Sequence, residues 1–174
     1  MNKDITTNLT PLSGVSSITT PMDVKGLTRE QLTEWVRGYG QKPYRAEQLF
    51  KWMHEKGVRT FGDMSNIPNS IADPCRARIG GLSLEKVLLS RDGTRKMILQ
   101  RATGERIESV IIPMGDDRFT QCVSSQVGCK MACSFCATAQ MPVRSNLETS
   151  EIVDQVYHAR AIMEKDGKRV TNLV

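Results

Sequence analysis

The sequence lacks the apolar runs and export features of a protein that enters or crosses a membrane. No stretch of its 174 residues approaches the roughly 20 consecutive apolar residues that a membrane-spanning helix needs. The first residues, MNKDITTNLTPLSG, contain no apolar segment and do not look like a secretory signal. Hydrophobic residues make up 39% and charged residues 25%, which excludes a collagen and a fully disordered chain. We therefore expect a cytoplasmic globular protein without a membrane partner.

The sequence also lacks a disulfide framework and a paired zinc knuckle. It has five unevenly spaced cysteines, and without an export signal these indicate a reducing compartment. Three of them, Cys129, Cys133 and Cys136, form a C-x3-C-x2-C run. Thiolates are preferred ligands of iron–sulfur clusters and zinc, but structural zinc has four ligands, usually from two cysteine pairs. With no second pair, three ligands leave one coordination position open, which favours a reactive cluster.

The net charge of +5 is unevenly distributed along the chain. Residues 23–101 carry 15 basic and 9 acidic side chains, whereas residues 102–174 carry 8 and 9. An excess of positive charge favours a polyanionic partner, nucleic acid first. At this chain length the same charge is also compatible with ordinary solubility, so charge alone leaves both interpretations open.

The first part of the chain divides into a leader and a helical module. Residues 1–22, rich in Thr, Ser, Pro and Asn, predict a flexible leader, and residues 23–80 predict an accessory domain of short helices. Thr28 and Gln31 form a capping box, and a third helix is expected after Pro68. The apolar stripes of the first two helices are Leu32, Trp35, Val36, Tyr39 and Ala46, Leu49, Phe50, Met53. Basic residues follow the polar faces: Arg37, Lys42, Arg45, Lys51, Lys56 and Arg59.

A period of two replaces the helical pattern in residues 81–117. The segments 84–90 and 94–100 flank an Asp92-Gly93 turn, which is a strong hairpin signal. Residues 106–112 predict a further strand. This segment is therefore expected to form a small antiparallel sheet.

Residues 118–174 predict the first unit of a parallel βα repeat. A strand at 120–125 runs into the cysteine loop, Ser150 is expected to cap a helix, and a new strand starts near Arg169. The overall fold class is α/β. Because the chain stops inside a strand, we expect an incomplete barrel.

The flanks of the cysteine run resemble a known family. The run itself resembles the cluster loop of the radical S-adenosylmethionine superfamily. The longer segment CVSSQVGCKMACSFCATAQ, preceded by RIESVIIP and GQKPYRAEQLFKWM, is similar to the dual-specificity 23S rRNA and tRNA adenine-C2 methyltransferases. The resemblance extends from about residue 26 to the end of the chain and reaches roughly the first half of a family member.

This resemblance implies a fold, cofactors, partners and site residues. Cys129, Cys133 and Cys136 would hold a [4Fe–4S] cluster whose fourth iron binds S-adenosyl-L-methionine. Glu108 would accept the proton from the adenine ring, and Cys122 would resolve a protein–RNA adduct. The helical module would help to engage 23S rRNA and tRNA, and an electron donor would reduce the cluster. The fold would be a truncated radical-SAM (β/α) barrel that starts at residue 118.

Each candidate residue also has a plainer interpretation. Glu108 shares its strand face with Val110 and Ile112, and apolar neighbours that exclude water would suit a general base. Without the resemblance, Glu108 is equally well an exposed edge-strand carboxylate. A lone strand cysteine such as Cys122 is more often a small buried hydrophobe. His54 and His158 lie on amphipathic helices and are expected to face solvent or a partner. The aromatic residues Trp35, Phe50 and Trp52 are expected in the core.

Two other functions remain open at this point. One is a basic RNA-binding module with a thiolate-bound zinc and no catalysis. The other is a related adenine-C8 rRNA methyltransferase, which shares the cluster loop. Under either methyltransferase interpretation we expect that this chain alone does not complete the reaction, because the family's methyl-carrying cysteine lies near its C-terminus.

Overall fold

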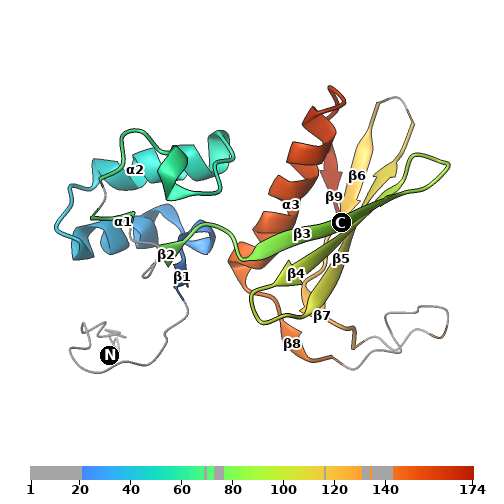
Figure 1. The fold of residues 1–174 in the computed structure, drawn as a ribbon, viewed down its shortest axis with the longest axis horizontal. Coiled ribbons are helices and arrows are strands. Elements are labelled where there is room, and N and C mark those ends of the chain that lie inside the picture. Colours follow the sequence, from blue (N-terminus) through green and yellow to red (C-terminus); the bar gives the residue numbers. More distant parts are fainter. Residues whose placement is uncertain (1–20, 69, 73–76, 116, 131–133, 135–142) are drawn as a thin grey trace, which may run out of the picture.

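The protein is formed by two lobes that lie side by side (Figure 1). The structure, a computed structural model, describes residues 21–68, 70–72, 77–115, 117–130, 134 and 143–174. The described residues up to 80 form a helical lobe, and those from 81 onward form a sheet lobe, each with its own hydrophobic core. Within these ranges, no helix has the length and apolar character required to cross a bilayer.

The helical lobe consists of short helices around a small core. Its elements are β1 (Met22–Asp23), a 3-10 turn (Val24–Gly26), α1 (Arg29–Gly38), α2 (Tyr44–Phe50), a π-helical turn (Lys51–Glu55), a 3-10 turn (Phe61–Asp63) and β2 (Ala77–Arg78). The predicted capping box is confirmed: Thr28 Oγ1 accepts a hydrogen bond from the Gln31 N–H, and Gln31 Oε1 accepts one from the Thr28 N–H. The predicted apolar stripes supply the buried residues Leu32, Val36, Ala46, Leu49 and Met53.

The structure differs from two expectations for this lobe. Met22, expected at the end of the leader, pairs with Ala77 in a parallel two-stranded sheet, while residues 1–20 lie outside the described residues. The helix expected after Pro68 is not formed in the described part of that segment. The N–H groups of Ile71 and Ala72 bond to the Pro68 carbonyl and close a single turn, and β2 begins shortly afterwards.

The sheet lobe contains a five-stranded mixed sheet. Its strands are β3 (Leu82–Leu89), β4 (Arg95–Arg101), β5 (Arg106–Pro113), β6 (Phe119–Cys122) and β9 (Asn172–Leu173), and they lie in this order. The first four strands are antiparallel neighbours, and β9 is parallel to β6. The predicted hairpin turn joins β3 to β4: Gly93 has a φ of 86°, and Asp92 Oδ1 accepts a hydrogen bond from the Thr94 N–H. The predicted strands are formed, but the one expected at 120–125 ends at Cys122 and the one expected to start near Arg169 starts at Asn172. The small antiparallel sheet expected for residues 81–117 is part of this larger sheet.

The parallel β6–β9 pair confirms the predicted βαβ unit. Between these strands lie β7 (Gln126–Val127), β8 (Ser145–Asn146) and α3 (Thr149–Glu164). The expected cap is wrong by two residues, because Glu148, and not Ser150, caps α3 through a capping box with Glu151. Ser150 is instead buried in the first turn, where its backbone lies against Gly26 of the helical lobe.

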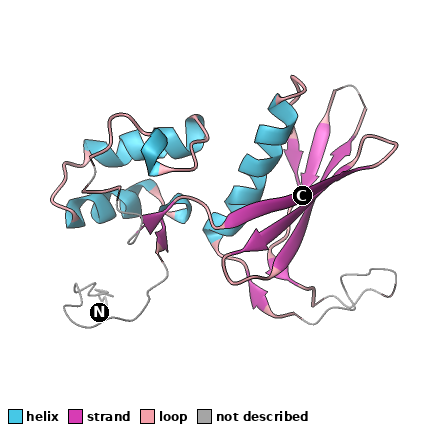
Figure 2. Ribbon diagram, in the orientation of Figure 1, coloured by secondary structure: helices cyan, strands magenta, loops and turns pink. Residues whose placement is uncertain are grey.

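Helix α3 covers one face of the sheet (Figure 2). The core beneath it contains Leu82, Met97, Leu99, Ile107, Ile111, Phe119, Ala159 and Met163. Because successive strand residues point to opposite faces, the alternate residues of β4, β5 and β6 point away from α3. In the described part of the chain this second face is partly exposed, and it presents the side chains of Lys96, Ile98, Glu108, Val110 and Cys122. The fold therefore presents the two residues predicted to be catalytic, Glu108 and Cys122, on one accessible sheet face.

Candidate active site

Glu108 lies in the middle of β5 on the sheet face opposite α3. Its strand partner on β4 is Ile98, and its carboxylate Oε1 lies 3.1 Å from Lys96 Nζ. The Glu108 side chain is 52% exposed. The alternation with Val110 and Ile112 is confirmed, but the expectation that these neighbours exclude water from the carboxylate is wrong. The structure buries the opposite face of β5, and Glu108 contacts solvent and the Lys96 ammonium.

Cys122 ends β6 and is directly paired with Val110 of β5. Its side chain is exposed, so the alternative of a small buried hydrophobe does not apply. Because Val110 is two residues from Glu108, Cys122 and Glu108 are diagonal neighbours on one sheet face. Such neighbours have Cα atoms about 7–8 Å apart, which is within reach of a shared substrate.

The chain immediately after Cys122 is held against Glu108. Ser124 Oγ donates a hydrogen bond of 2.7 Å to the Glu108 carbonyl oxygen, so the contact between the two strands continues beyond the last paired residue of β6. Glu108 is therefore paired in register with Ile98 of β4, and its carbonyl oxygen is bonded to the segment that leads to the cysteine loop.

The cysteine loop is closed at its base by a short antiparallel pair. Gln126 pairs with Asn146 and Val127 with Ser145, so the chain leaves and returns at one place. Cys129 follows Gly128, whose φ of 82° is a conformation that glycine adopts without strain. Cys129 is half-buried; Cys133 and Cys136, predicted as its fellow ligands, lie outside the described residues. A thiolate donor at this position fits an iron–sulfur cluster, which takes cysteine sulfur as its ordinary ligand.

The sequence did not indicate the buried charges at the junction of the two lobes. Asp154 of α3 accepts hydrogen bonds from Lys25 Nζ at 2.7 Å and from Arg59 Nη1 at 2.8 Å, both from the helical lobe. Arg59 was expected on a solvated face. Burial lowers the pKa of the Lys25 ammonium from its ordinary value of 10.5, and the Asp154 carboxylate beside it opposes this shift. In the sequence, the only sign of these buried charges is that acidic residues recur along the face of α3 that is buried.

The two histidines lie at the same junction and contact other parts of this chain, whereas they were expected to face solvent or a partner. His54 Nδ1 is 2.7 Å from the Tyr157 hydroxyl, and His158 Nε2 is 3.1 Å from the Leu82 carbonyl oxygen. Burial lowers the pKa of both imidazoles, and nearby Lys25 and the arginines lower it further. Trp35, Phe50 and Trp52 pack against the core of the helical lobe, as predicted.

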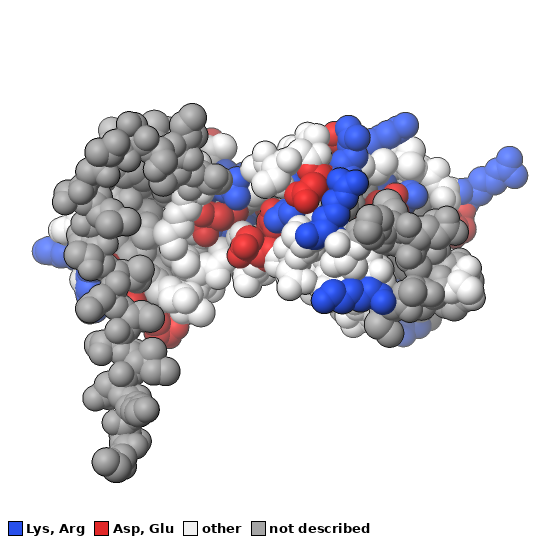
Figure 3. Space-filling model, turned by 90° about the horizontal axis from the view of Figure 1, so that it is seen from below, with Lys and Arg blue, Asp and Glu red and all other residues white. Residues whose placement is uncertain are grey.

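Basic side chains are not confined to the helical lobe. Seen from below, Lys and Arg side chains are spread over the sheet lobe, and several Asp and Glu side chains lie near the junction (Figure 3). The basic side chains of β3 and β4 include Lys86, Arg95, Lys96 and Arg101. Of these, Arg95, Lys96 and Arg101 form ion pairs with Asp166, Glu108 and Glu151.

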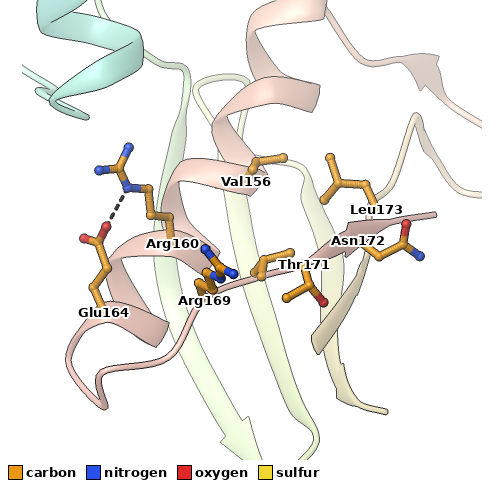
Figure 4. A pocket seen from close by; sticks show the side chains of 8 residues that line it. Val156, Arg160, Glu164, Arg169, Thr171, Asn172 and Leu173 are labelled. Carbon is orange, nitrogen blue, oxygen red and sulfur yellow. Dashed lines mark hydrogen bonds and ion pairs between the residues drawn. The ribbon is translucent and has the colours of Figure 1, made fainter. Parts of the chain in front are cut away.

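A groove of about 700 Å³ lies between the end of α3 and β9, away from the predicted site. It is lined by Val156, Arg160, Glu164, Arg169, Val170, Thr171, Asn172 and Leu173 (Figure 4). Arg160 and Glu164 are bonded to each other at its rim, at 2.6 Å. Glu108, Cys122 and Cys129 do not line it, so the candidate chemistry belongs to the open sheet face and the base of the cysteine loop.

Comparisons with known proteins show which family this chain is similar to. Residues 22–77 match the family model of the ribosomal RNA large subunit methyltransferase N-terminal domain. The dual-specificity RNA methyltransferase RlmN of Geobacter sulfurreducens is 44% identical over 139 residues, which are 79% of this chain and 38% of that protein. The probable dual-specificity RNA methyltransferase RlmN of Clostridioides difficile is 42% identical over 154 residues, 87% of this chain and 43% of that protein.

A solved structure shows the same fold. A radical SAM methyltransferase from Sphaerobacter thermophilus superposes with a TM-score of 0.81 at 35% identity, over 88% of this chain and 46% of that chain. The α/β fold predicted from the sequence is thereby confirmed. The chain spans less than half the length of these relatives.

Proposed function

This chain resembles the N-terminal part of the RlmN-type radical SAM RNA methyltransferases in sequence and fold, and from that premise we propose that it supplies their cluster loop, proton acceptor and resolving thiol. The proposed reaction is methylation of carbon 2 of adenine in 23S rRNA and tRNA through a methyl-cysteine intermediate. The observation that carries the proposal is the placement of Glu108 and Cys122 as same-face neighbours, directly before the cysteine loop.

The proposed ligands of a [4Fe–4S] cluster are Cys129, Cys133 and Cys136. Bound there with S-adenosyl-L-methionine, the cluster supplies the one-electron chemistry that an unreactive adenine carbon requires. The closed base of the loop at β7 and β8 fixes where the loop leaves the sheet. Reduction of the cluster requires an external electron donor, which is a further proposed partner.

Glu108 is proposed as the group that accepts the proton from adenine carbon 2. Its carboxylate is half exposed and lies 3.1 Å from the Lys96 ammonium, on the accessible face of the sheet. Its place on the sheet is set by its register with Ile98 of β4 and by the hydrogen bond from Ser124 to its carbonyl oxygen. A positioned carboxylate is a common general base in enzymes.

Cys122 is proposed as the thiol that releases the methylated RNA. Its sulfur would form a disulfide with the sulfur of the methyl-carrying cysteine, and the electron pair of the broken carbon–sulfur bond would take up a proton on the product. The exposed side chain of Cys122 is available for this attack. In this family the methyl-carrying cysteine lies near the C-terminus, and this chain spans 38–44% of the relatives named RlmN that it matches. We therefore propose that residues 1–174 alone do not complete the reaction.

The helical lobe is proposed to engage the RNA. Its match to a ribosomal RNA methyltransferase domain and the small positive excess of residues 23–80, with 10 basic and 7 acidic side chains, support this role. Binding through phosphates predicts an affinity for tRNA that falls steeply between roughly 50 and 200 mM salt, by about 10³-fold if some six contacts are made. Salt-independent binding would contradict an electrostatic RNA contact.

The proposed reaction is tested by completing the chain. Residues 1–174 are joined to the C-terminal part of the Geobacter sulfurreducens relative and assayed under anaerobic conditions with a 23S rRNA fragment and tRNA. We expect mass spectrometry to place the methyl group on carbon 2 of adenine, and we expect Glu108→Gln and Cys122→Ala to abolish product release. Glu164→Gln, at the distant groove, is the matched control and should retain activity. A methyl group on carbon 8, or unchanged product in both site variants, would contradict the proposal.

A further inference from the structure

A chain of buried polar side chains runs beneath the candidate active site. Ser109 of β5, Gln121 of β6 and Gln155 of α3 are 1%, 0% and 0% exposed. They lie on the face that α3 covers, opposite the face that presents Glu108 and Cys122. Buried amides and hydroxyls are costly unless they are hydrogen-bonded, so the partners of these three side chains show what they hold in place.

The side chain of Gln155 clamps the backbone of Ser124. Gln155 Oε1 accepts a hydrogen bond from the Ser124 N–H at 2.8 Å, and Gln155 Nε2 donates one to the Ser124 carbonyl oxygen at 2.8 Å. Ser124 Oγ in turn donates to the Glu108 carbonyl oxygen at 2.7 Å. One buried amide is therefore connected to the backbone of the proposed base through a single serine.

The backbone carbonyl of Gln155 begins a second branch. It accepts a hydrogen bond of 3.0 Å from Gln121 Nε2, which also donates one of 2.9 Å to Ser109 Oγ. Ser109 Oγ donates to the Cys122 carbonyl oxygen at 2.8 Å. The second branch thus ends on the backbone of the proposed resolving thiol.

The network acts where the strand pairing ends. The β5–β6 register extends only as far as the Val110–Cys122 pair, and the hydrogen bonds of Ser124 itself run through its own side chain and that of Gln155. Its neighbours Val123 and Ser125 are held by backbone bonds to Val174 and Leu147. Gln121 Oε1 is buried without a hydrogen-bond partner in the described part of the chain. An unsatisfied buried acceptor lowers stability, and an apolar core at this place would avoid that cost. The arrangement is therefore poorly explained by stability alone.

We infer that Gln155 is a positioning residue for the proposed methyl transfer: through its side chain and Ser124 it sets Glu108. The branch to Cys122 starts from the backbone carbonyl of Gln155, which a change of side chain leaves in place. The inference rests on the proposed function of Glu108. A displacement of about 1 Å in a catalytic group costs up to roughly 100-fold in rate, so loss of the clamp should act on turnover more than on RNA binding.

The test compares Gln155→Met with Met163→Ala. Methionine keeps the approximate length of the side chain but neither donates nor accepts a strong hydrogen bond. Met163 is also fully buried on α3 and is outside the network, so its truncation weakens the same helix without touching either branch. Hydrogen exchange of the Ser124 amide is measured in residues 1–174, and kcat and KM for RNA are measured in the completed chain described above.

We expect the Ser124 amide of Gln155→Met to exchange at least about tenfold faster than that of Met163→Ala, and kcat to fall about tenfold or more with KM unchanged. A kcat no lower than that of Met163→Ala would overturn the positioning role, even where Glu108→Gln and Cys122→Ala are inactive. If those two variants keep normal turnover, the proposed function itself has failed, and the inference with it.

Discussion

Lys25 Nζ and Asp154 Oδ1 lie 2.7 Å apart, with both side chains fully buried, and this ion pair joins the helical lobe to α3. Asp154 also accepts hydrogen bonds from Arg59 and from the Leu82 N–H. A single carboxylate on α3 therefore binds both the helical lobe and the start of β3. The relative placement of the two lobes, and so of the proposed RNA-engaging surface and the sheet face, depends on it.

Replacement of Asp154 by Asn should strongly destabilise the protein. The change leaves the buried Lys25 ammonium without a counter-charge, and breaking such a pair costs about 3–5 kcal/mol. The double variant Lys25→Met/Asp154→Asn should lose less than Asp154→Asn alone, because no uncompensated buried ammonium remains. Urea unfolding measures both. Glu164→Gln, in the exposed Arg160–Glu164 pair, should change stability by less than about 1 kcal/mol.

Gly80 permits the close approach of Asp154 to the connection between the lobes. Its φ is 80°, and a Cβ at this position would lie 2.7 Å from Asp154 Oδ2. Gly80→Ala therefore combines backbone strain, about 1–3 kcal/mol, with a contact that forces Asp154 to move. Gly104→Ala is the control, because Gly104 has a φ of 91° but a Cβ there would meet no atom of the described residues within 4 Å. Equal losses of stability in the two variants would show that the contact with Asp154 is unimportant.

Stability should fall as the pH decreases through 6.5. Burial lowers the pKa of His54 and His158 below their ordinary 6.5, so in this range the unfolded chain binds more protons than the folded one. Their contribution is complete above pH 6.5 and is lost as the pH falls from there toward the lowered pKa values. Urea unfolding about one pH unit above and one below this value measures the slope. His54→Phe/His158→Gln should have a flatter profile, and an unchanged slope would contradict the assignment.

Glu108→Gln should leave the fold intact. The Glu108–Lys96 pair is half exposed, and such pairs contribute about 0–1 kcal/mol to stability. Thermal unfolding of this variant should therefore closely match that of the unmodified chain. A loss of several kcal/mol would show a structural role for Glu108, and a catalytic defect in the variant could then no longer be assigned to proton transfer.

Local patterns in the sequence predicted the elements well. The capping box of Thr28 and Gln31 depends on residues three apart, and the Asp92-Gly93 turn depends on adjacent residues, so both can be recognised without tertiary information. The period of two likewise placed Glu108 on the face opposite Ile107 and Ile111. The sequence could not show which of these faces α3 would cover, and the desolvation expected for Glu108 was wrong for that reason.

Long-range contacts were beyond the sequence pattern. Lys25 and Asp154 are 129 positions apart, and each side chain alone has the pattern of an ordinary surface charge. Gln155 lies between Ile152 and Ala159 on the packed face of α3, but its position alone does not show that its partner is Ser124, 31 positions away. The error at α3 arose because Ser150 is a residue type common at an N-cap and Glu148 is not. Glu148 takes that position through the reciprocal bonds of its capping box with Glu151.

The most direct test of the account is the metal content of the cysteine loop. Residues 1–174 are purified without oxygen, treated with iron and sulfide, and analysed for iron, sulfide, zinc and visible absorption, with Cys129→Ala as the matched variant. We predict about four irons and four sulfides per chain with a broad visible absorption, and loss of both in Cys129→Ala. A colourless, iron-free protein, or one zinc per chain without sulfide, would contradict a radical SAM function.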